Sequence, residues 1–66
     1  MKSIYDVQQL LKRYGTFIYT GDRLGDLDLM GMEINELHEM KFIETYDYQM
    51  AKLLLRSERT RLSKES

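Results

Sequence analysis

Basic side chains near the carboxyl end of the chain recur at helical spacing. Lys52, Arg56 and Arg59 follow one another at intervals of four and three residues, which places them on one face of a helix. Ammonium and guanidinium groups in such a row can bind the phosphates of a nucleic acid. The alternative is a structural role, because basic side chains near the end of a helix also stabilise its dipole.

Tyrosines lie beside basic residues in the amino-terminal half of the chain. A basic groove with aromatic side chains is the arrangement that binds single-stranded DNA or RNA, since bases stack on aromatic rings. The same rings could instead close a small core. These patterns predict a set of nucleic-acid-binding residues, namely Lys12, Arg13, Tyr14, Tyr19, Arg23, Lys52, Arg56 and Arg59.

Charge is distributed unevenly along the chain, although the net charge is only -1. Residues 1–21 carry three basic side chains and one acidic, residues 22–47 carry two and eight, and residues 48–66 carry five and two. A basic face can therefore exist on a protein that is not basic overall. The nucleic-acid hypothesis requires the two basic ends to meet in space. The acidic middle could contact a basic protein partner or simply keep the protein soluble.

Residues that would indicate catalysis or metal binding are scarce. The chain has no cysteine and a single histidine, His38, so neither a hydrolytic triad nor a zinc site is expected. Asp26 and Asp28 imitate the start of a calcium-binding loop, but Met30 stands where an oxygen ligand is needed. We therefore predict that the protein is not an enzyme and has no cofactor and no metal.

The length of 66 residues allows one domain with a thin margin of stability. The chain contains no proline and four glycines, which favours helix. The amino terminus lacks the apolar run of a signal peptide, and no apolar stretch is long enough to span a membrane. We expect a soluble, cytoplasmic protein whose last few residues are disordered.

The elements that must position these side chains are helices. Apolar residues spaced three and four apart predict helices at about residues 4–14, 22–40 and 45–62. Short connections favour antiparallel neighbours, so the predicted fold class is all-α, a small three-helix bundle that forms a single domain over residues 1–66. The predicted inner faces consist of Ile4, Val7, Leu10, Leu11 and Tyr14, then Leu24, Leu27, Met30, Ile34, Leu37 and either Met40 or Lys41, then Met50, Ala51, Leu53, Leu54 and Tyr46.

Each predicted helix begins with capping chemistry. Ser3 with Asp6 resembles a capping box before the first helix, and Gly15 can end that helix in the left-handed conformation. Asp22 and Thr45 are the residues expected to cap the second and third helices.

The connector between the first two helices is unusually apolar. Its residues YGTFIYTGDR are aromatic and branched at the centre, where an ordinary linker would be polar. We expect Phe17 and Ile18 to fill the open end of the bundle, and Phe42 and Ile43 to pack against the bundle in the second connection. A short edge strand is the alternative, although no second strand is visible to pair with it.

Some apolar residues fit none of the inner faces. Leu29, Met32 and Leu55 are the examples. Unassigned apolar side chains on a small protein favour an alternative to nucleic-acid binding, namely a protein-interaction adaptor or a self-associating helical bundle that forms a homo-oligomer.

Longer stretches of the chain resemble a known family. The segment GDRLGDLDLMGMEINELHEMKFI, followed by YQMAKLLLRSE, resembles the YqgQ-like family of small bacterial cytosolic proteins, and YDVQQLLKRYGTFIYTGDR is similar to the amino-terminal half of that family. The resemblance covers nearly the whole chain. It implies a cytosolic three-helix bundle with no known catalytic activity and a suggested role in binding single-stranded nucleic acid.

Overall fold

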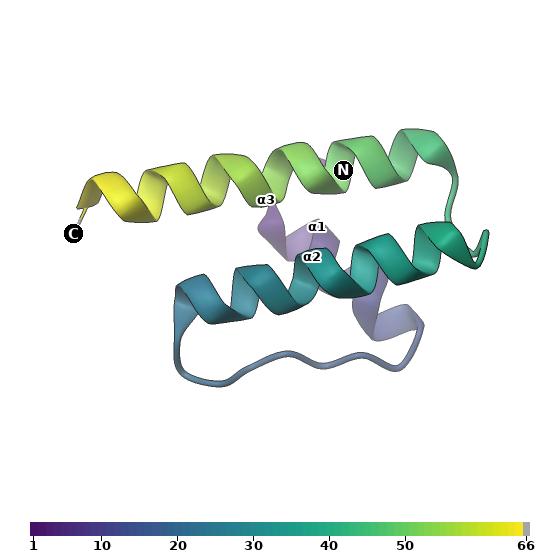
Figure 1. Cartoon of the computed structure of the whole chain (residues 1–66), viewed down its shortest axis with the longest axis horizontal. Helices are drawn as coiled ribbons and strands as arrows, with labels where there is room; N and C mark the ends of the chain where they lie inside the picture. Colours follow the sequence, from purple (N-terminus) through teal and green to yellow (C-terminus); the bar gives the residue numbers. More distant parts are fainter. Residues whose placement is uncertain (66) are drawn as a thin grey trace.

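Three helices make up most of the chain. The computed structural model describes residues 1–65, with helices α1 (Ile4–Arg13), α2 (Arg23–Glu39) and α3 (Thr45–Glu65) (Figure 1). No strand occurs in this part of the chain, which confirms the all-α prediction. Helix α3 continues past its predicted end at about residue 62. The predicted disorder of the last few residues falls partly on Ser66, which lies outside the described residues.

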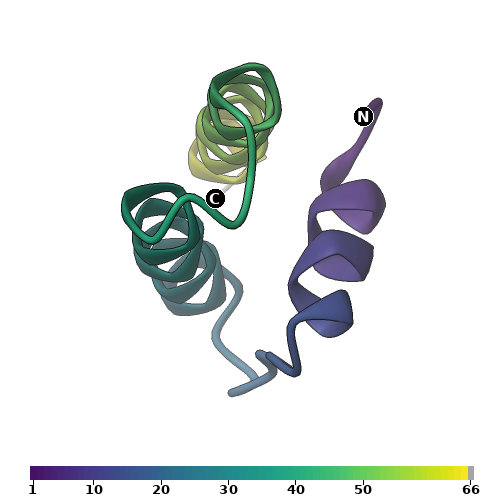
Figure 2. The same ribbon diagram turned by 90° about the vertical axis from the view of Figure 1, so that its right-hand side faces the viewer.

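The helices form an antiparallel pair with a third helix lying across it. Helices α2 and α3 run side by side in opposite directions, as predicted. Figure 2 views this pair almost end-on, whereas α1 runs across the view and contacts both. The difference from a bundle of three aligned helices follows from the connector, which runs back along α2 instead of turning tightly (Figure 1).

One core lies where the three helices meet. Its buried members are Val7, Leu10, Leu11, Leu27, Met30, Ile34, Leu37, Ile43, Ala51 and Leu55. Burying an aliphatic side chain contributes about 1.5–3 kcal/mol relative to leaving it exposed. This cluster is therefore the main stabilising feature of the fold, since the described residues contain no disulfide and no cluster of metal ligands.

The predicted inner face of α3 was partly wrong. Leu55 is buried, whereas Leu53 is 56% exposed and Tyr46 is 66% exposed. Ala51 and Leu55 are four residues apart and share the core face, so Leu53, two residues from each, must point to the opposite side. The sequence predicts that this segment is helical, but which side of the helix faces the core depends on where α1 and α2 pack against it.

The ends of the predicted inner faces are also exposed. Leu24 and Met40, at the two ends of α2, are 38% and 55% exposed. In the α2–α3 connection Ile43 is buried as predicted, but Phe42 is 55% exposed. A bundle with a short α1 leaves these terminal positions uncovered.

The amino-terminal ends of the helices are stabilised in different ways. Before α1, the Asp6 carboxylate accepts hydrogen bonds from the Ser3 and Lys2 backbone N–H groups at 3.3 and 2.7 Å, as a capping box requires. These bonds, the Lys2 bond foremost, lower the pKa of Asp6. Asp22 occupies the N-cap of α2, but its side chain makes no capping hydrogen bond. Thr45 is not a cap, because it is already the first helical residue.

The α2–α3 connection is braced by a ring stack. The His38 and Tyr48 rings lie 4.0 Å apart and nearly parallel, with an interplanar angle of 11°. The Thr45 hydroxyl lies 3.4 Å from His38 Nε2. The single histidine therefore has a packing role in this connection, as expected for an isolated histidine on a helix.

The carboxyl ends of α1 and α2 share one geometry. After α1, Thr16 N–H donates to Leu11 O and Gly15 N–H donates to Lys12 O. After α2, the Phe42 N–H donates to Leu37 O and the Lys41 N–H donates to His38 O. Both are Schellman motifs, which require a residue with positive φ just after the C-cap. Gly15 has φ 83° at this position, and Lys41 has φ 64°.

The substitution Lys41→Gly should therefore stabilise the protein. A non-glycine residue in the left-handed region costs roughly 1–2 kcal/mol, and glycine loses about 0.5–1 kcal/mol of backbone entropy on folding. We expect a net gain of about 0.5–1 kcal/mol, measured by thermal unfolding as an upward shift of several degrees. Gly15→Ala, at the equivalent position of the other motif, is the matched control and should destabilise. Equal effects of the two substitutions on stability would contradict the conclusion that the left-handed backbone at Lys41 is strained.

Candidate nucleic-acid interface

A buried carboxylate attaches the connector to α2. Asp26 is 8% exposed, and its Oδ1 accepts hydrogen bonds from Thr20 N–H at 2.9 Å and Thr20 Oγ1–H at 2.6 Å. The Thr20 hydroxyl oxygen also accepts a hydrogen bond from the Asp22 N–H at 3.3 Å. A buried charge requires such partners, because an unpaired carboxylate away from water is strongly unfavourable. These bonds hold the end of the connector against the first turns of α2.

Side chains alternate along the connector. Ile18 is half-buried and packs against the core, whereas Phe17 is 74% exposed and Tyr19 is 90% exposed. An extended chain places successive side chains on opposite faces, so one inward residue puts both its neighbours outward. The prediction that Ile18 fills the core is confirmed, and the prediction that Phe17 does so is wrong.

The exposed rings border a shallow apolar hollow. This hollow has a volume of about 200 Å³ and lies between α1, the connector and α2. Lys12, Phe17 and Tyr19 line it, together with the amide side chains of Gln8 and Gln9. The Lys12 Nζ atom lies 5.8 Å from the centre of the Phe17 ring, within the range of a cation–π contact. Aromatic rings, an ammonium group and amides with both donors and acceptors therefore meet at one place.

Tyr14 makes contacts with the rest of the fold that Tyr19, the other tyrosine predicted to stack bases, lacks. Its hydroxyl donates a hydrogen bond to the Phe42 carbonyl oxygen at 2.8 Å, and its ring stacks on the Phe42 ring at 5.9 Å. These contacts join the end of α1 to the α2–α3 connection. Of the two tyrosines predicted to stack bases, only Tyr19 has a ring that makes no aromatic contact among residues 1–65.

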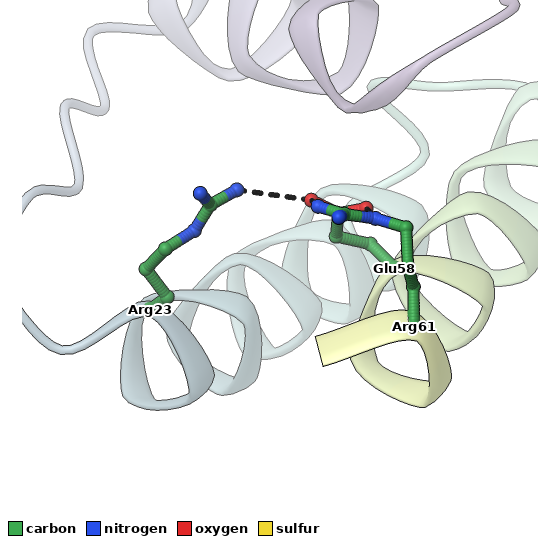
Figure 3. A network of polar contacts seen from close by, with 3 residues as sticks. All are labelled: Arg23, Glu58 and Arg61. Atoms are coloured by element: carbon green, nitrogen blue, oxygen red, sulfur yellow. Dashed lines mark hydrogen bonds and ion pairs between the residues drawn. The ribbon is translucent and has the colours of Figure 1, made fainter. Parts of the chain in front are cut away.

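Two of the predicted phosphate ligands are engaged with carboxylates. Arg23 Nη2 lies 3.0 Å from Glu58 Oε2, and Arg61 binds the same carboxylate at 2.7 Å. Figure 3 shows Glu58 between the two guanidinium groups. Arg59 forms an ion pair with Asp28 on α2. The Arg23–Glu58 and Arg59–Asp28 pairs join α3 to the first turns of α2, whereas the Arg61–Glu58 pair lies within α3.

The Glu58 carboxylate is held in its charged form by this network. Its side chain is 16% exposed. The hydrogen bond from Arg61 is the main cause that lowers the pKa of Glu58, and the charges of Arg61 and Arg23 act in the same direction.

The remaining predicted cations line three different hollows. Lys52 and Arg56 make no ion pair within residues 1–65 and line an open hollow of about 440 Å³ between α2 and α3, beside Asp28 and Asn35. Arg13 lines a separate hollow together with Asp6 and Asp47. Lys12 belongs to the aromatic hollow.

The two basic ends of the chain do not form one strip. Helix α1 ends below α2, and the second half of α3 extends along the other end of the molecule (Figures 1 and 2). The joint basic strip expected from the sequence is therefore wrong, and any nucleic-acid site on this protein has to consist of other groupings of side chains. The structure brings together Lys12, Phe17 and Tyr19 around one hollow, and Lys52 and Arg56 around another. Tyr19 and Arg23, both predicted to bind nucleic acid, also line a common hollow of about 430 Å³.

Other kinds of site find little support in the described part of the chain. No group of three or more histidine, aspartate or glutamate side chains is placed to hold a metal ion there. None of the three helices in this part is long and apolar enough to cross a membrane.

Comparison with known proteins identifies the family of this chain. The family model described as YqgQ-like matches residues 1–61. The chain belongs to the YqgQ-like family. It is 41% identical over 58 residues to the Bacillus subtilis (strain 168) protein called "Uncharacterized protein YqgQ", a match that covers 88% of this chain and 82% of the relative.

The site in this YqgQ-like protein includes residues that sequence patterns had assigned elsewhere. Phe17 was assigned to the core, and Gln8 and Gln9 had no assigned role. The alternation in Thr16–Thr20 was the available signal, because a period of two separates Ile18 from Phe17 and Tyr19. The glutamines gave no such signal, since exposed polar residues are common on any helix.

Thr20→Val should destabilise this YqgQ-like protein, because it leaves the buried Asp26 carboxylate with one hydrogen bond fewer. We expect a loss of about 1–3 kcal/mol, measured by urea unfolding. Thr16→Val is the matched control, since the Thr16 hydroxyl makes no hydrogen bond within residues 1–65, and it should change stability by less than about 0.5 kcal/mol. Equal losses would mean that the Thr20 hydroxyl does not hold the connector.

Glu58→Gln should lower stability at neutral pH and progressively less in acid. A carboxylate whose pKa is lower in the folded than in the unfolded state stabilises the folded protein at pH values above its ordinary pKa of 4.5. This contribution is lost as the pH falls through the pKa of the folded state. We expect a loss of at most about 1 kcal/mol at pH 7, which shrinks progressively when thermal unfolding is repeated at falling pH below 4.5.

Glu36→Gln is the matched control for Glu58→Gln. Glu36 is exposed and makes no ion pair within residues 1–65, so stability at pH 7 should change by less than about 0.5 kcal/mol. A Glu58→Gln effect that persists unchanged in acid would contradict the role assigned to this network.

Proposed function

We propose that this protein binds single-stranded DNA or RNA with little sequence specificity and without catalysing a reaction. The proposed site consists of Lys12, Phe17 and Tyr19 around the apolar hollow, with Gln8 and Gln9 at its edge. The observation that carries the proposal is the exposure of Phe17 and Tyr19, at 74% and 90%, on a segment that is itself held firmly against α2.

Stacking is the interaction that these rings can supply. Burial of a large apolar side chain would contribute about 1.5–3 kcal/mol, and the fold forgoes that contribution at both positions. Base stacking on a protein aromatic ring contributes about 1–3 kcal/mol and tolerates any base. The rings lie two residues apart on an extended chain, so their Cα atoms are about 7 Å apart and each ring can receive its own base.

Phosphate binding falls mainly to the cations that have no carboxylate partner. Lys12 lies within the hollow itself, and Lys52 and Arg56 form a second cationic site between α2 and α3. Arg59 contributes less, because Asp28 is its ion-pair partner. Arg23 shares the single Glu58 carboxylate with Arg61, so its charge is only partly offset. Amide groups such as those of Gln8 and Gln9 both donate and accept hydrogen bonds, so they favour no single base.

The test is an oligonucleotide titration at low salt, with fluorescence anisotropy of a labelled single strand as the readout. Tyr19→Ala should weaken binding about tenfold, which corresponds to roughly 1.4 kcal/mol and the loss of one stacked base. Lys12→Gln should weaken binding and reduce the dependence on salt by about one released counterion.

Tyr46→Ala is the matched control for this titration. Tyr46 is an exposed tyrosine on α3, away from the hollow, at 66% exposure, and its replacement should leave the affinity unchanged. Absence of binding by the unaltered protein at low salt would overturn the proposal. Binding that depends on Lys52 and Arg56 but not on Tyr19 would move the site to the α2–α3 hollow.

A further inference from the structure

The connector has a backbone edge that forms no hydrogen bonds within the described residues. Its two ends are bonded, since Thr16 N–H donates to Leu11 O at 3.0 Å and Thr20 N–H donates to Asp26 Oδ1 at 2.9 Å. Between them, the N–H and C=O groups of Phe17, Ile18 and Tyr19 bond to no other group among residues 1–65. Unpaired polar groups on an extended, apolar segment are a template for strand pairing.

The positions of the two hydrogen-bonded residues, Thr16 and Thr20, show which backbone edge of the connector is free. Along an extended chain, the N–H groups of alternate residues point to the same edge. The N–H groups of Thr16 and Thr20 point toward the protein's own helices. Those of Phe17 and Tyr19 therefore point to the opposite edge, away from the helices.

We propose that this free edge pairs with the same edge of a second copy, so that the protein forms a homodimer through an antiparallel two-stranded ribbon. In the symmetric register, Ile18 faces Ile18 of the partner subunit. Phe17 then exchanges N–H···O=C bonds with Tyr19 of the partner subunit, and the reciprocal pair forms on the other side of the two-fold axis.

The side chains fit this register. Phe17 lies directly opposite Tyr19 of the partner subunit on the exposed face, and aromatic cross-strand pairs of this kind stabilise antiparallel ribbons. Ile18 points to the other face, where it already packs against its own core. Pairing of the edge therefore leaves the contact between Ile18 and its own core in place.

The composition favours a second copy over an unrelated peptide. Residues 14–21 carry no charged side chain in a chain that is 32% charged, so self-pairing meets no like-charge repulsion. Residues 14–21 themselves offer an acidic or basic peptide no complementary side chain, and the neighbouring Lys12 ammonium lies over the Phe17 ring. Gly15 and Gly21, with φ of 83° and 90°, turn the chain at both ends and limit the ladder to residues 16–20.

The edge also lacks the usual protection against association. Natural edge strands are shielded by lysine, proline or a bulge, and none of these interrupts Thr16–Thr20. The ribbon is short, and two short strands pair weakly unless helices support them. The dimer should therefore form in a concentration-dependent manner. The ribbon would also place the aromatic rings of both copies on one face. The use of that face to stack bases rests on the proposed function, whereas the pairing itself does not.

The register can be tested by cross-linking, because the natural chain has no cysteine. Phe17→Cys and Tyr19→Cys alter two exposed positions and should leave the helices intact, which circular dichroism checks. In an equimolar mixture under mild oxidation, we expect disulfides between the two variants, since these positions face each other. Each variant alone should cross-link poorly, because identical positions are about 7–8 Å apart on the diagonal, beyond ready disulfide reach.

The free edge can be tested by removing one N–H group. Sedimentation equilibrium of the unaltered protein, without nucleic acid, should show a monomer–dimer equilibrium. Tyr19→Pro removes the donor and should weaken dimerisation at least about tenfold, whereas Tyr19→Ala, which keeps the N–H, should have a smaller effect. A strict monomer at all concentrations, equal behaviour of the two variants, or disulfides independent of register would overturn the proposal. Titration of oligonucleotide into the Tyr46→Ala and Tyr19→Ala proteins tests the binding function separately.

Discussion

The arrangement of this protein depends on the buried carboxylate of Asp26. A carboxylate near the start of a helix is favoured by the helix dipole, but when it is buried it also needs hydrogen-bond donors. Thr20 supplies two of them, one from its backbone and one from its hydroxyl. This link holds the connector along α2, and the connector in turn determines where α1 can lie. The crossing of α1 over the α2–α3 pair follows from that path (Figure 1).

The same link explains why aromatic side chains stay in water on so small a protein. With Thr20 held against α2, the extended chain places Ile18 on the core and must place Phe17 and Tyr19 outside. Collapse of either ring onto the core would require the chain to turn over, which would break the Thr20–Asp26 bonds. The exposed rings, and the free backbone edge beside them, are therefore consequences of one buried interaction. They supply both the proposed binding face and the proposed dimer contact.

Electrostatics divides the basic residues into two groups with different roles. Arg23 and Arg59 pair with carboxylates across the α2–α3 contact, and Arg61 binds the same Glu58 carboxylate as Arg23 from within α3. Figure 3 shows the Glu58 cluster. The positive charge of these arginines stabilises the hairpin more than it attracts an anion. Lys12, Lys52 and Arg56 make no ion pair in the described part of the chain, so their charges remain available to phosphates. A net charge of -1 conceals this division.

The helices were determined by local information in the sequence. Apolar spacing, the Ser3–Asp6 capping pair and Gly15 placed the element boundaries within a few residues, because these signals act over one or two turns. The phase of α3 and the exposure of Phe17 could not be predicted in this way. Leu53 and Leu55 have the same local chemistry, and only the position of the neighbouring helices decides which one is buried.

The candidate site shows the same limit. Sequence alone indicated which residues were basic or aromatic, and it suggested their class of ligand. The tertiary structure decided which of those side chains are engaged, because the carboxylates that pair with Arg23 and Arg59 lie 35 and 31 residues away along the chain. Contacts over such separations depend on how the helices pack, and local spacing contains no information about them.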